Sequence, residues 1–305
     1  MLNLVWLRSF VTLVHCKGFQ TAGEALGIAQ PTVSQHIQKL EMQLGVCLFQ
    51  RNRLGCQPTR EALALLPIAQ SMLTLNQRAH EAVKSAPLRV GASSNIGIYM
   101  LNPQLKTFLD DTGAVGVDLV IDRNPTIAEK LVNGELDIAL MEWWQPQPGF
   151  QWQQWKQEPL VLIVPPEHPY AALGVIGQEQ LLELELLGGE SGTGTGRLLR
   201  RYFGADAKLP RVSMQLGSTE AVKQAVKAGL GISLVLASSV IEEVRNASLR
   251  AIPVADPGLA KALFVIWPET SARHRPVPAF VRHLCSPEAR LTGAAADRLA
   301  DSRSH

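Results

Sequence analysis

The stretch that decides the fold of the N-terminal part reads FQTAGEAL over residues 19–26 and AQPTVSQ over residues 29–35. We predict a short helix over 20–26, whose small residues Ala22, Gly23 and Ala25 let another helix pack closely across it. Gly27 then opens a tight turn. Pro31 begins the next helix, where its missing N–H costs nothing. A short helix, a glycine turn and a longer helix are the parts of a helix-turn-helix.

The apolar spacing on either side fits this arrangement. A preceding helix that ends at Gly18 has one apolar stripe, formed by Leu7, Phe10, Val11 and Val14. The longer helix buries Val33, Ile37, Leu40 and Leu44 and turns its polar residues the other way. These side chains can read base edges in the major groove. Periodicity alone leaves open an ordinary helical bundle with glutamines on a solvated face.

The same run, continued by Ile37, Leu40-Glu41, Leu44-Gly45, Leu48-Phe49, Arg51 and Pro58-Thr59, resembles the DNA-binding domain of LysR-type transcriptional regulators. The resemblance covers Leu7 to Ala62 and implies a winged helix-turn-helix over 1–58 that binds double-stranded DNA, with RNA polymerase as a further partner. The DNA contacts that it implies are Gln30, Pro31, Thr32, Ser34, Gln35, Gln38, Lys39 and the wing residues Arg51 and Arg53.

Three positions in this region depart from the family pattern. Gly23 stands where the family usually has alanine, which should loosen the second helix slightly. Gln35 and Gln38 stand where arginine is common, so the contacts to phosphate should depend on Lys39, Arg60 and the wing arginines.

A long helical pattern follows over 59–86, with Thr59 as its N-cap and a bend expected at Pro67. Its apolar residues alternate at spacings of three and four, as in a coiled-coil seam: Leu65, Ile68, Met72, Leu75, Ala79, Ala82 and Ala86. A lone amphipathic helix packed on its own domain is the alternative. The family resemblance favours a dimerising linker helix, hence a homodimer that pairs into a homotetramer.

Charge and composition limit the function classes. Residues 1–86 carry eight Lys or Arg against four Glu, a net +4, whereas the other residues carry twenty-one against twenty-three acidic side chains, a net −2. This asymmetry suits phosphate contact at the N-terminal end. The N-terminus lacks a secretory signal pattern and no run of about 18 apolar residues occurs, so we expect a cytoplasmic protein with no membrane partner.

The four cysteines lie far apart and no histidine cluster accompanies them, so neither a zinc site nor a disulfide framework is expected. We interpret Cys16, Cys47, Cys56 and Cys285 as buried structural cysteines. A redox-sensing thiol is the alternative.

From residue 87 on, predicted strands and helices alternate, which specifies an open α/β sheet with ligands at the carboxyl ends of its strands. We expect strands at 88–91, 117–121, 136–141, 160–164, 186–187, 232–236 and 263–267, and helices at 99–111, 126–133, 178–182, 196–203, 220–228 and 277–285.

Five motifs in this part match the family's effector domain: residues 91–97, 133–137, 165–169, 216–223 and 226–232. They are most similar to the branch that includes regulators of carbon-fixation and sulfur-assimilation genes. The resemblance implies a two-lobed domain built like a periplasmic binding protein over 87–290. Lobe I comprises 87–164 and 268–290, lobe II comprises 165–267, and the chain crosses near Val164-Pro165 and Trp267-Pro268. We expect residues 291–305 to form a disordered tail.

The effector residues that we predict are backbone and hydroxyl groups at helix starts: Ser93, Ser94, Asn95, Asn124, Thr126, Thr193, Thr195 and Ser218. Because helix N-termini favour anions, the effector should be a small anion. The alternative is that these side chains only cap their helices. Relatives often have an arginine where this chain has Gly196, but Arg197 and Arg123 could supply charge.

Two other functions have little support in the sequence. The run Gly192-Thr193-Gly194-Thr195-Gly196 lacks the ending of a phosphate-binding loop, and we find no recognisable catalytic motif, so we expect neither an enzyme nor a cofactor. A purely architectural DNA-binding protein would leave the C-terminal domain without a purpose.

Overall fold

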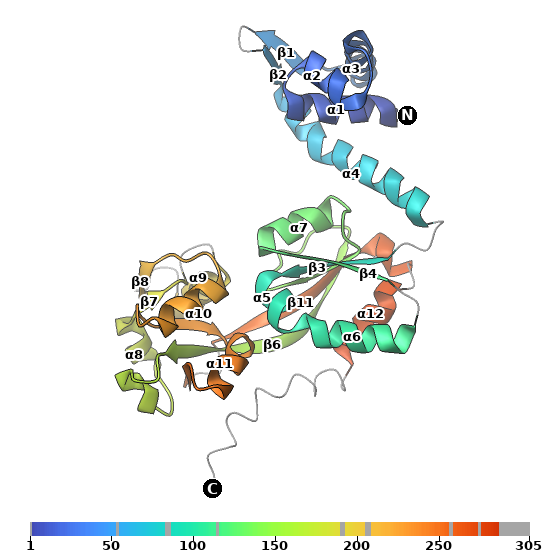
Figure 1. Ribbon diagram of the computed structural model, residues 1–305. Helices are drawn as coiled ribbons and strands as arrows, with labels where there is room; N and C mark the ends of the chain where they lie inside the picture. The colour runs from blue at the N-terminus through green and yellow to red at the C-terminus, as the bar shows by residue number, and fades with distance from the viewer. Residues whose placement is uncertain are drawn as a thin grey trace. The chain divides into compact units, whose positions relative to one another are not determined.

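A computed structural model describes residues 2–52, 55–82, 87–113, 116–189, 193–204, 209–255, 259–273 and 276–286 (Figure 1). Two compact units are distinguished in it. One comprises Met1–Pro87 with Glu129–Leu136, and the other comprises Leu88–Ala128 and the described residues from Asp137 onward.

The N-terminal residues form a three-helix helix-turn-helix with a wing, as predicted. Its helices are α1 (Leu4–Cys16), α2 (Phe19–Leu26) and α3 (Gln30–Leu44), and the wing is an antiparallel hairpin of β1 (Phe49–Asn52) and β2 (Gly55–Pro58). Side chains from all three helices and from the start of the wing meet in one core: Leu7, Phe10, Leu13, Ala22, Val33, Ile37, Leu40 and Leu48.

The turns between these helices differ in detail from the prediction. The first helix ends at Cys16, with Lys17 in the left-handed conformation (φ 54°), whereas Gly18 is the extended residue that precedes α2. Gly23 also has a packing role in this fold. A Cβ there would come within 2.8 Å of the Ile28 carbonyl oxygen, so the glycine allows the turn to fold closely onto α2.

The long helix α4 (Arg60–Ala82) begins as predicted after Thr59, whose hydroxyl accepts a hydrogen bond from the Ala62 amide (3.2 Å), and it continues through Pro67. The expected apolar stripe divides between two faces. Leu65 and Met72 pack against the helix-turn-helix core. Ile68 and Leu75 are 57% and 55% exposed. Ala86 lies outside the described residues.

The second unit is built on one mixed sheet with strand order β10-β6-β11-β5-β3-β4, to which β9 adds by pairing with β6. β3 (Leu88–Ser93) runs parallel to β4 (Val117–Asp122) and β5 (Ile138–Met141), and β11 (Ala260–Pro268) runs antiparallel to β5. We call these strands, together with α5 (Ser94–Tyr99), α6 (Leu101–Thr112) and α12 (Pro276–Cys285), lobe I. The α6 and α12 helices meet at Phe108 and Phe280, whose ring centroids are 4.8 Å apart.

Lobe II contains β9 (Ser233–Leu236), β10 (Arg250–Pro253) and a separate parallel pair, β7 (Glu185–Leu187) and β8 (Arg211–Met214). Its helices are α8 (Gln178–Glu183), α9 (Gly194–Phe203), α10 (Thr219–Lys227) and α11 (Ile241–Arg245). Helix α7 (Asn124–Val132) follows β4.

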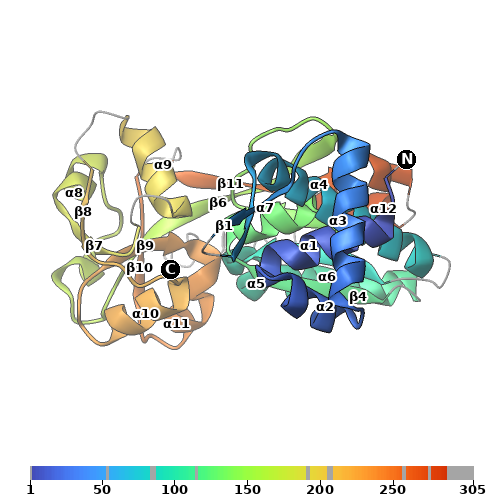
Figure 2. The ribbon, with the colours of Figure 1, turned by 90° about the horizontal axis from the view of Figure 1, so that it is seen from above.

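The lobes are joined by β6 (Phe150–Val164) and β11, which extend between them (Figure 2). β6 pairs with β11 as far as Pro159, opposite Ala260, and from Leu160 onward it pairs with β9 and β10. This exchange of partners inside the strands differs from the predicted crossings, which lie at the strand ends. The first part of β6 is mostly exposed, so it lacks the apolar run that marked residues 160–164 as a strand.

Candidate DNA-reading face and effector site

One face of α3 is free of contacts with its own core. Val33, Ile37 and Leu40 are buried, and the predicted contact residues lie on the other sides of the helix. Exposed among them are Gln30, Pro31, Gln35, Gln38 and Lys39, whereas Thr32 and Ser34 are partly buried. The helix therefore presents mainly uncharged hydrogen-bonding groups, as the sequence predicted.

Polar contacts fix the orientation of this helix. Glu41 accepts hydrogen bonds from the backbone amides of Leu48 and Phe49 (2.7 and 3.2 Å), which ties α3 to the start of the wing. Ser9 Oγ lies 2.8 Å from His36 Nδ1, which links α1 to α3. Burial, followed by the charge of Lys39, lowers the pKa of His36.

Two of the predicted basic contacts are placed by the structure. Lys39 Nζ lies 5.7 Å from the centroid of the Trp6 ring, a cation–π distance within its own domain. Arg51 lies in β1, where it pairs in register with Cys56. Arg53 lies outside the described residues. Met42, which sequence reasoning missed, is 78% exposed and one turn beyond Gln38 on the same side of α3.

The predicted effector residues lead to a chain of polar contacts between the lobes. Asn95 in α5 donates from Nδ2 to Glu142 Oε1 (2.9 Å) and accepts at Oδ1 from the Thr219 hydroxyl (2.7 Å) at the start of α10. Glu142 Oε2 in turn accepts from Lys261 Nζ (2.7 Å) in β11. Asn95 was predicted, but Glu142, Lys261 and Thr219 were not, because no local motif relates residues so far apart in the chain.

The start of α9 lies directly against this ion pair. A Cβ on Gly194 would come within 2.6 Å of Glu142 Oε2, 2.9 Å of Lys261 Nζ and 3.1 Å of the Trp143 ring. Because Gly194 has no side chain, the first turn of α9 in lobe II can approach the ion pair. Arg197 in the same helix stacks over Trp143, with its Cζ 5.1 Å from the ring centroid.

Several other predicted effector residues are engaged in capping and bracing. Thr193 and Ser218 accept hydrogen bonds from backbone amides of their own helices, α9 and α10 (3.1 and 3.2 Å). Ser94 donates to the Asp122 carbonyl (3.1 Å). The Asn124 amide accepts from the Glu142 backbone and donates to the Trp143 carbonyl (2.8 and 3.1 Å). The capping alternative describes the contacts of Thr193 and Ser218, whereas Ser94 and Asn124 bond to backbone groups outside their own helices.

Ser93 is different, because its hydroxyl is buried and has no hydrogen-bond partner among the described residues. Thr126 and Thr195 are partly buried. Buried hydroxyl groups without a partner are uncommon and call for an explanation.

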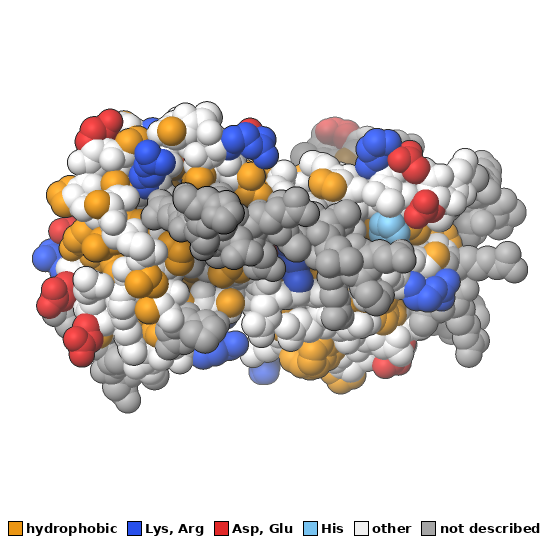
Figure 3. Space-filling view, turned by 90° about the horizontal axis from the view of Figure 1, so that it is seen from below, with side chains coloured by type: hydrophobic (Ala, Val, Ile, Leu, Met, Phe, Trp, Pro, Cys, Tyr) orange, Lys and Arg blue, Asp and Glu red, His pale blue; other side chains and the backbone are white. Residues whose placement is uncertain are grey.

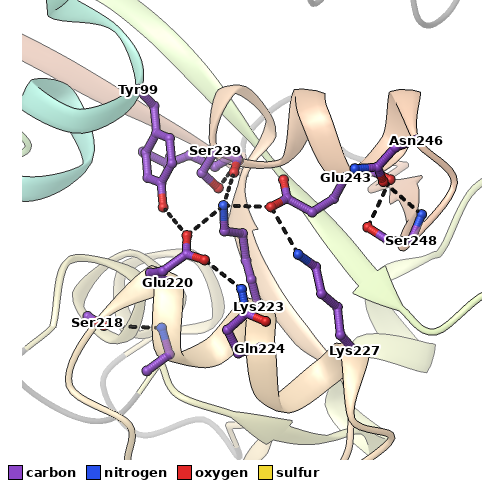
Figure 4. A network of polar contacts seen from close by, with 12 residues as sticks. Tyr99, Ser218, Glu220, Lys223, Gln224, Lys227, Ser239, Glu243, Asn246 and Ser248 are labelled. Carbon is purple, nitrogen blue, oxygen red and sulfur yellow. Dashed lines mark hydrogen bonds and ion pairs between the residues drawn. The ribbon is translucent and has the colours of Figure 1, made fainter.

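Figure 4 shows a second polar network, which is centred on Lys223. It adjoins the contacts of Asn95 and Thr219, since Glu220 follows Thr219 in α10. Lys223 in α10, 4% exposed, contacts Glu220 (2.8 Å), Glu243 (3.0 Å) and the Ser239 carbonyl (3.0 Å). Tyr99 reaches it from lobe I. Its hydroxyl donates to Glu220 (3.2 Å) and its ring centroid lies 4.8 Å from Lys223 Nζ. The two lobes therefore share a second set of contacts.

The pKa values in this network move in opposite directions. The hydrogen bond from Lys223, followed by one from Gln224, lowers the pKa of Glu220 to about 2. Burial lowers the pKa of Lys223, but hydrogen bonds to Glu220 and Glu243 outweigh it, so the net shift is upward. Burial raises the pKa of Tyr99. Lys223 thus carries its charge beside two ionised carboxylates.

The cysteines only partly match the prediction of buried structural residues. Cys56 is buried and Cys16 and Cys285 are partly buried, but Cys47, in the segment between α3 and the wing, is exposed.

In the part of the chain that is described, no helix is both long and apolar enough to cross a bilayer. On the face drawn in Figure 3, the coloured acidic and basic side chains are interspersed.

A winged helix-turn-helix followed by a two-lobed α/β domain, with polar side chains gathered where the lobes meet, defines a DNA-binding regulator that responds to a ligand. Two family models match: the bacterial regulatory helix-turn-helix protein, lysR family, over residues 4–63, and the LysR substrate binding domain over residues 81–286. The chain belongs to the LysR family of transcriptional regulators, with a DNA-binding and an effector-binding domain.

Among curated proteins, it is 53% identical over 196 residues to PtxE of Stutzerimonas stutzeri, named as an HTH-type transcriptional regulator, a match that covers 64% of this chain and 100% of that protein. It is 33% identical to the HTH-type transcriptional regulator CbbR of Rhizobium meliloti, over 85% of each chain. A "Probable RuBisCO transcriptional regulator" of Emiliania huxleyi is 26% identical, with 93% and 94% of the two chains covered, as expected for the carbon-fixation branch. These relatives are named as regulators and not as enzymes.

Solved structures share the whole architecture. A full-length OxyR variant from Pseudomonas aeruginosa has a TM-score of 0.69 at 24% identity, covering 94% of this chain and 96% of that one. CbnR in complex with its target DNA has a TM-score of 0.67 at 21% identity, covering 93% and 99%. At these identities the likeness shows the fold.

Proposed function

We propose that α3 of this regulator reads base edges in the major groove and that the wing contacts the DNA backbone or the minor groove. The contacts that we assign are Gln30, Pro31, Thr32, Ser34, Gln35, Gln38, Lys39, Arg51 and Arg53. The supporting observation is the exposed, mostly uncharged face of α3, since glutamine can bond adenine through two atoms and serine can bond either kind of base.

We infer that the effector is a small anion that binds where the lobes meet, at a site that includes Ser93, Ser94, Asn95, Asn124, Thr126, Thr193, Thr195 and Ser218. The observation that carries this inference is the chain Thr219–Asn95–Glu142–Lys261, because it joins both lobes and ends on a buried ammonium group. The starts of α9 and α10 add positive potential nearby.

We further propose that the chain acts in the cytoplasm as a homodimer, paired through α4 and assembling into a homotetramer, and that it works with RNA polymerase. Its domains would then be 1–58, the linker helix 59–86 and the effector domain 87–290. Exposed Ile68 and Leu75 on α4 support a pairing surface.

The reading face is tested by replacing Ser34 or Gln35 with alanine. Each variant should lose about 1–3 kcal/mol of binding to its specific site and little of its binding to random duplex, because base contacts carry sequence information. Arg51→Ala should instead weaken binding to every sequence and reduce its salt dependence. Equal losses on specific and random DNA for Ser34→Ala and Gln35→Ala, measured by fluorescence anisotropy, would show that another face of α3 reads the bases.

The effector site is tested by a thermal-shift screen of small organic and inorganic anions, followed by calorimetry on Ser93→Ala. Removing an unsatisfied buried hydroxyl should leave the thermal midpoint unchanged or raise it, whereas affinity for the anion found should fall by about 1–3 kcal/mol. Ser213→Ala, which removes a hydroxyl outside the assigned site that donates to the Leu186 carbonyl, is the control. A neutral or cationic effector would contradict the anion site and leave the DNA assignment standing.

A further inference from the structure

The Glu142–Lys261 ion pair in the effector domain is almost completely buried. Its Nζ–Oε2 distance is 2.7 Å, and the two side chains are only 7% and 5% exposed. Removing both charges from water is costly, and apolar residues of similar volume often serve stability equally well. Stability by itself therefore does not explain why an ion pair occupies this position.

The described residues use only part of the hydrogen-bonding capacity of the pair. Each carboxylate oxygen of Glu142 accepts one bond, from Asn95 and from Lys261 respectively. Lys261 has three N–H donors, and Glu142 is its one partner among the described residues. The buried hydroxyl of Ser93, two residues before Asn95, is also without a partner there. Among the described residues, Lys261 thus keeps spare donors beside a carboxylate that can accept further bonds.

The pair also lies where a ligand would meet both lobes. Glu142 directly follows β5 and Lys261 lies in β11, close to where β6 exchanges β11 for the lobe II strands. Gly194 brings the first turn of α9 against both charged groups. In this arrangement no Cβ fits between α9 and the pair, so a ligand that opens this contact would face an ammonium, a carboxylate and a helix N-terminus together.

We propose that this ion pair distinguishes effectors by whether one of their oxygens carries a proton. The effector is then a partly ionised oxyacid of the phosphate or phosphonate class. Lys261 binds an ionised oxygen, and Glu142 accepts a hydrogen bond from an oxygen that keeps its proton. The inference rests on the anion site proposed above, and it adds the chemical class of the anion.

The physical reason is the net neutrality of the pair. A fully ionised anion such as sulfate would set an oxygen lone pair against the Glu142 carboxylate, a repulsive contact in a site with little water. A phosphate or phosphonate oxygen that carries a proton near neutral pH would donate to that carboxylate instead. Sites built to bond a ligand O–H strongly reject analogues that lack it.

The test uses two matched pairs of tetrahedral anions, titrated into the full chain by calorimetry at about pH 6.5, near the second pKa of phosphate groups. Inorganic phosphate is compared with sulfate, and methylphosphonate with methanesulfonate. We expect the phosphorus member of each pair to bind at least about tenfold more tightly. Glu142→Gln should raise the affinity for both sulfur anions at least about tenfold, because glutamine removes the repulsion and offers an N–H donor.

Lys261→Met should abolish binding of all four anions. Because it leaves Glu142 buried without a counter-charge, the double variant Glu142→Gln/Lys261→Met serves as the second test, since it removes both charges. It should fold, as judged by its thermal midpoint, and bind none of the anions. Glu242→Gln and Lys106→Met, which change exposed side chains, should leave all four affinities unchanged.

Two results would overturn the inference, and they differ in what they say about the anion site. If the four anions bind equally and Lys261→Met loses them all, the anion site stands and the selective role of Glu142 is wrong. If none of the four binds, the oxyacid class is wrong, and the wider screen with Ser93→Ala decides separately whether any anion binds between the lobes.

Discussion

Lys223 illustrates how a single buried ammonium group can organise a site. It lies between Glu220 and Glu243, and the Tyr99 ring from the other lobe covers it (Figure 4). Because Lys223 is buried, its charge depends on these two carboxylates and in turn favours their ionised form. This accounts for the low pKa of Glu220 although half of its side chain is exposed.

The pKa of Glu220 leads to a prediction about pH. Because the folded value is about 2 and the usual value is 4.5, ionised Glu220 stabilises the fold above about pH 4.5, and this contribution is lost as the pH falls from 4.5 toward 2. The difference in unfolding free energy between wild type and Glu220→Gln should therefore be present at neutral pH and fade over that window. Its size should be about 1 kcal/mol or less, since the carboxylate is half exposed.

Urea unfolding at a series of pH values measures this difference. Glu242→Gln, which removes an exposed carboxylate paired with Arg245, is the control for the loss of one charge. A difference for Glu220→Gln that persists unchanged down to pH 2 would contradict the assigned role of Lys223.

At the scale of the element, α4 has two apolar sides, one packed and one exposed. Leu65 and Met72 complete the core of the DNA-binding domain, whereas Ile68 and Leu75 lie on a neighbouring, exposed side of the helix. The helix therefore packs on its own domain and also keeps Ile68 and Leu75 exposed, and their pairing with a second chain stays a prediction. The spacing of seven between Ile68 and Leu75 is the repeat of a coiled coil.

We predict that Leu75→Glu yields monomers in sedimentation velocity and loses specific DNA binding, because a charge in an apolar seam cannot be buried and two linked reading heads bind a two-fold site together. Leu63→Glu makes the same change at a residue that is 56% exposed and lies about 120° around the helix. It should remain dimeric. A dimeric Leu75→Glu variant would place the pairing surface elsewhere.

At the scale of the whole effector domain, two continuous strands connect the lobes. Because β6 and β11 exchange partners near Pro159 and Ala260, a change in the angle between the lobes would bend these strands and not a flexible loop. Side-chain contacts that include Asn95–Thr219 and Tyr99–Glu220 hold the lobes together in this arrangement. An effector can shift such an equilibrium only by its difference in affinity for the two arrangements.

Tyr99→Phe tests whether this arrangement is the one that binds. It removes the hydroxyl that donates to Glu220 and keeps the ring over Lys223. It should therefore weaken the contact between the lobes by about 0.5–1.5 kcal/mol. If the effector prefers the arrangement of the lobes that these contacts hold, its affinity measured by calorimetry should fall by a similar amount. Tyr202→Phe, in a helix of lobe II, is the control. Unchanged or tighter binding by Tyr99→Phe would mean that the effector favours a more open domain.

The sequence by itself determined the local elements whose signals lie within a few turns of chain. The helix-turn-helix could be predicted because Gly27, Pro31 and the apolar spacing of α3 each act on their own neighbourhood. The cap at Thr59 and the buried strands of the second unit could be predicted for the same reason, as could the helix starts that bear Thr193 and Ser218.

Only the tertiary structure decided which of these residues meet. Glu142 and Lys261 are far apart in sequence, and neither belongs to a local pattern, so their pairing follows from the register of β11 beside β5 and from the folding of α9 onto both. The division of the α4 stripe likewise depends on the body against which the helix packs. Long-range contacts of this kind are set by sheet register and packing, which no local spacing encodes.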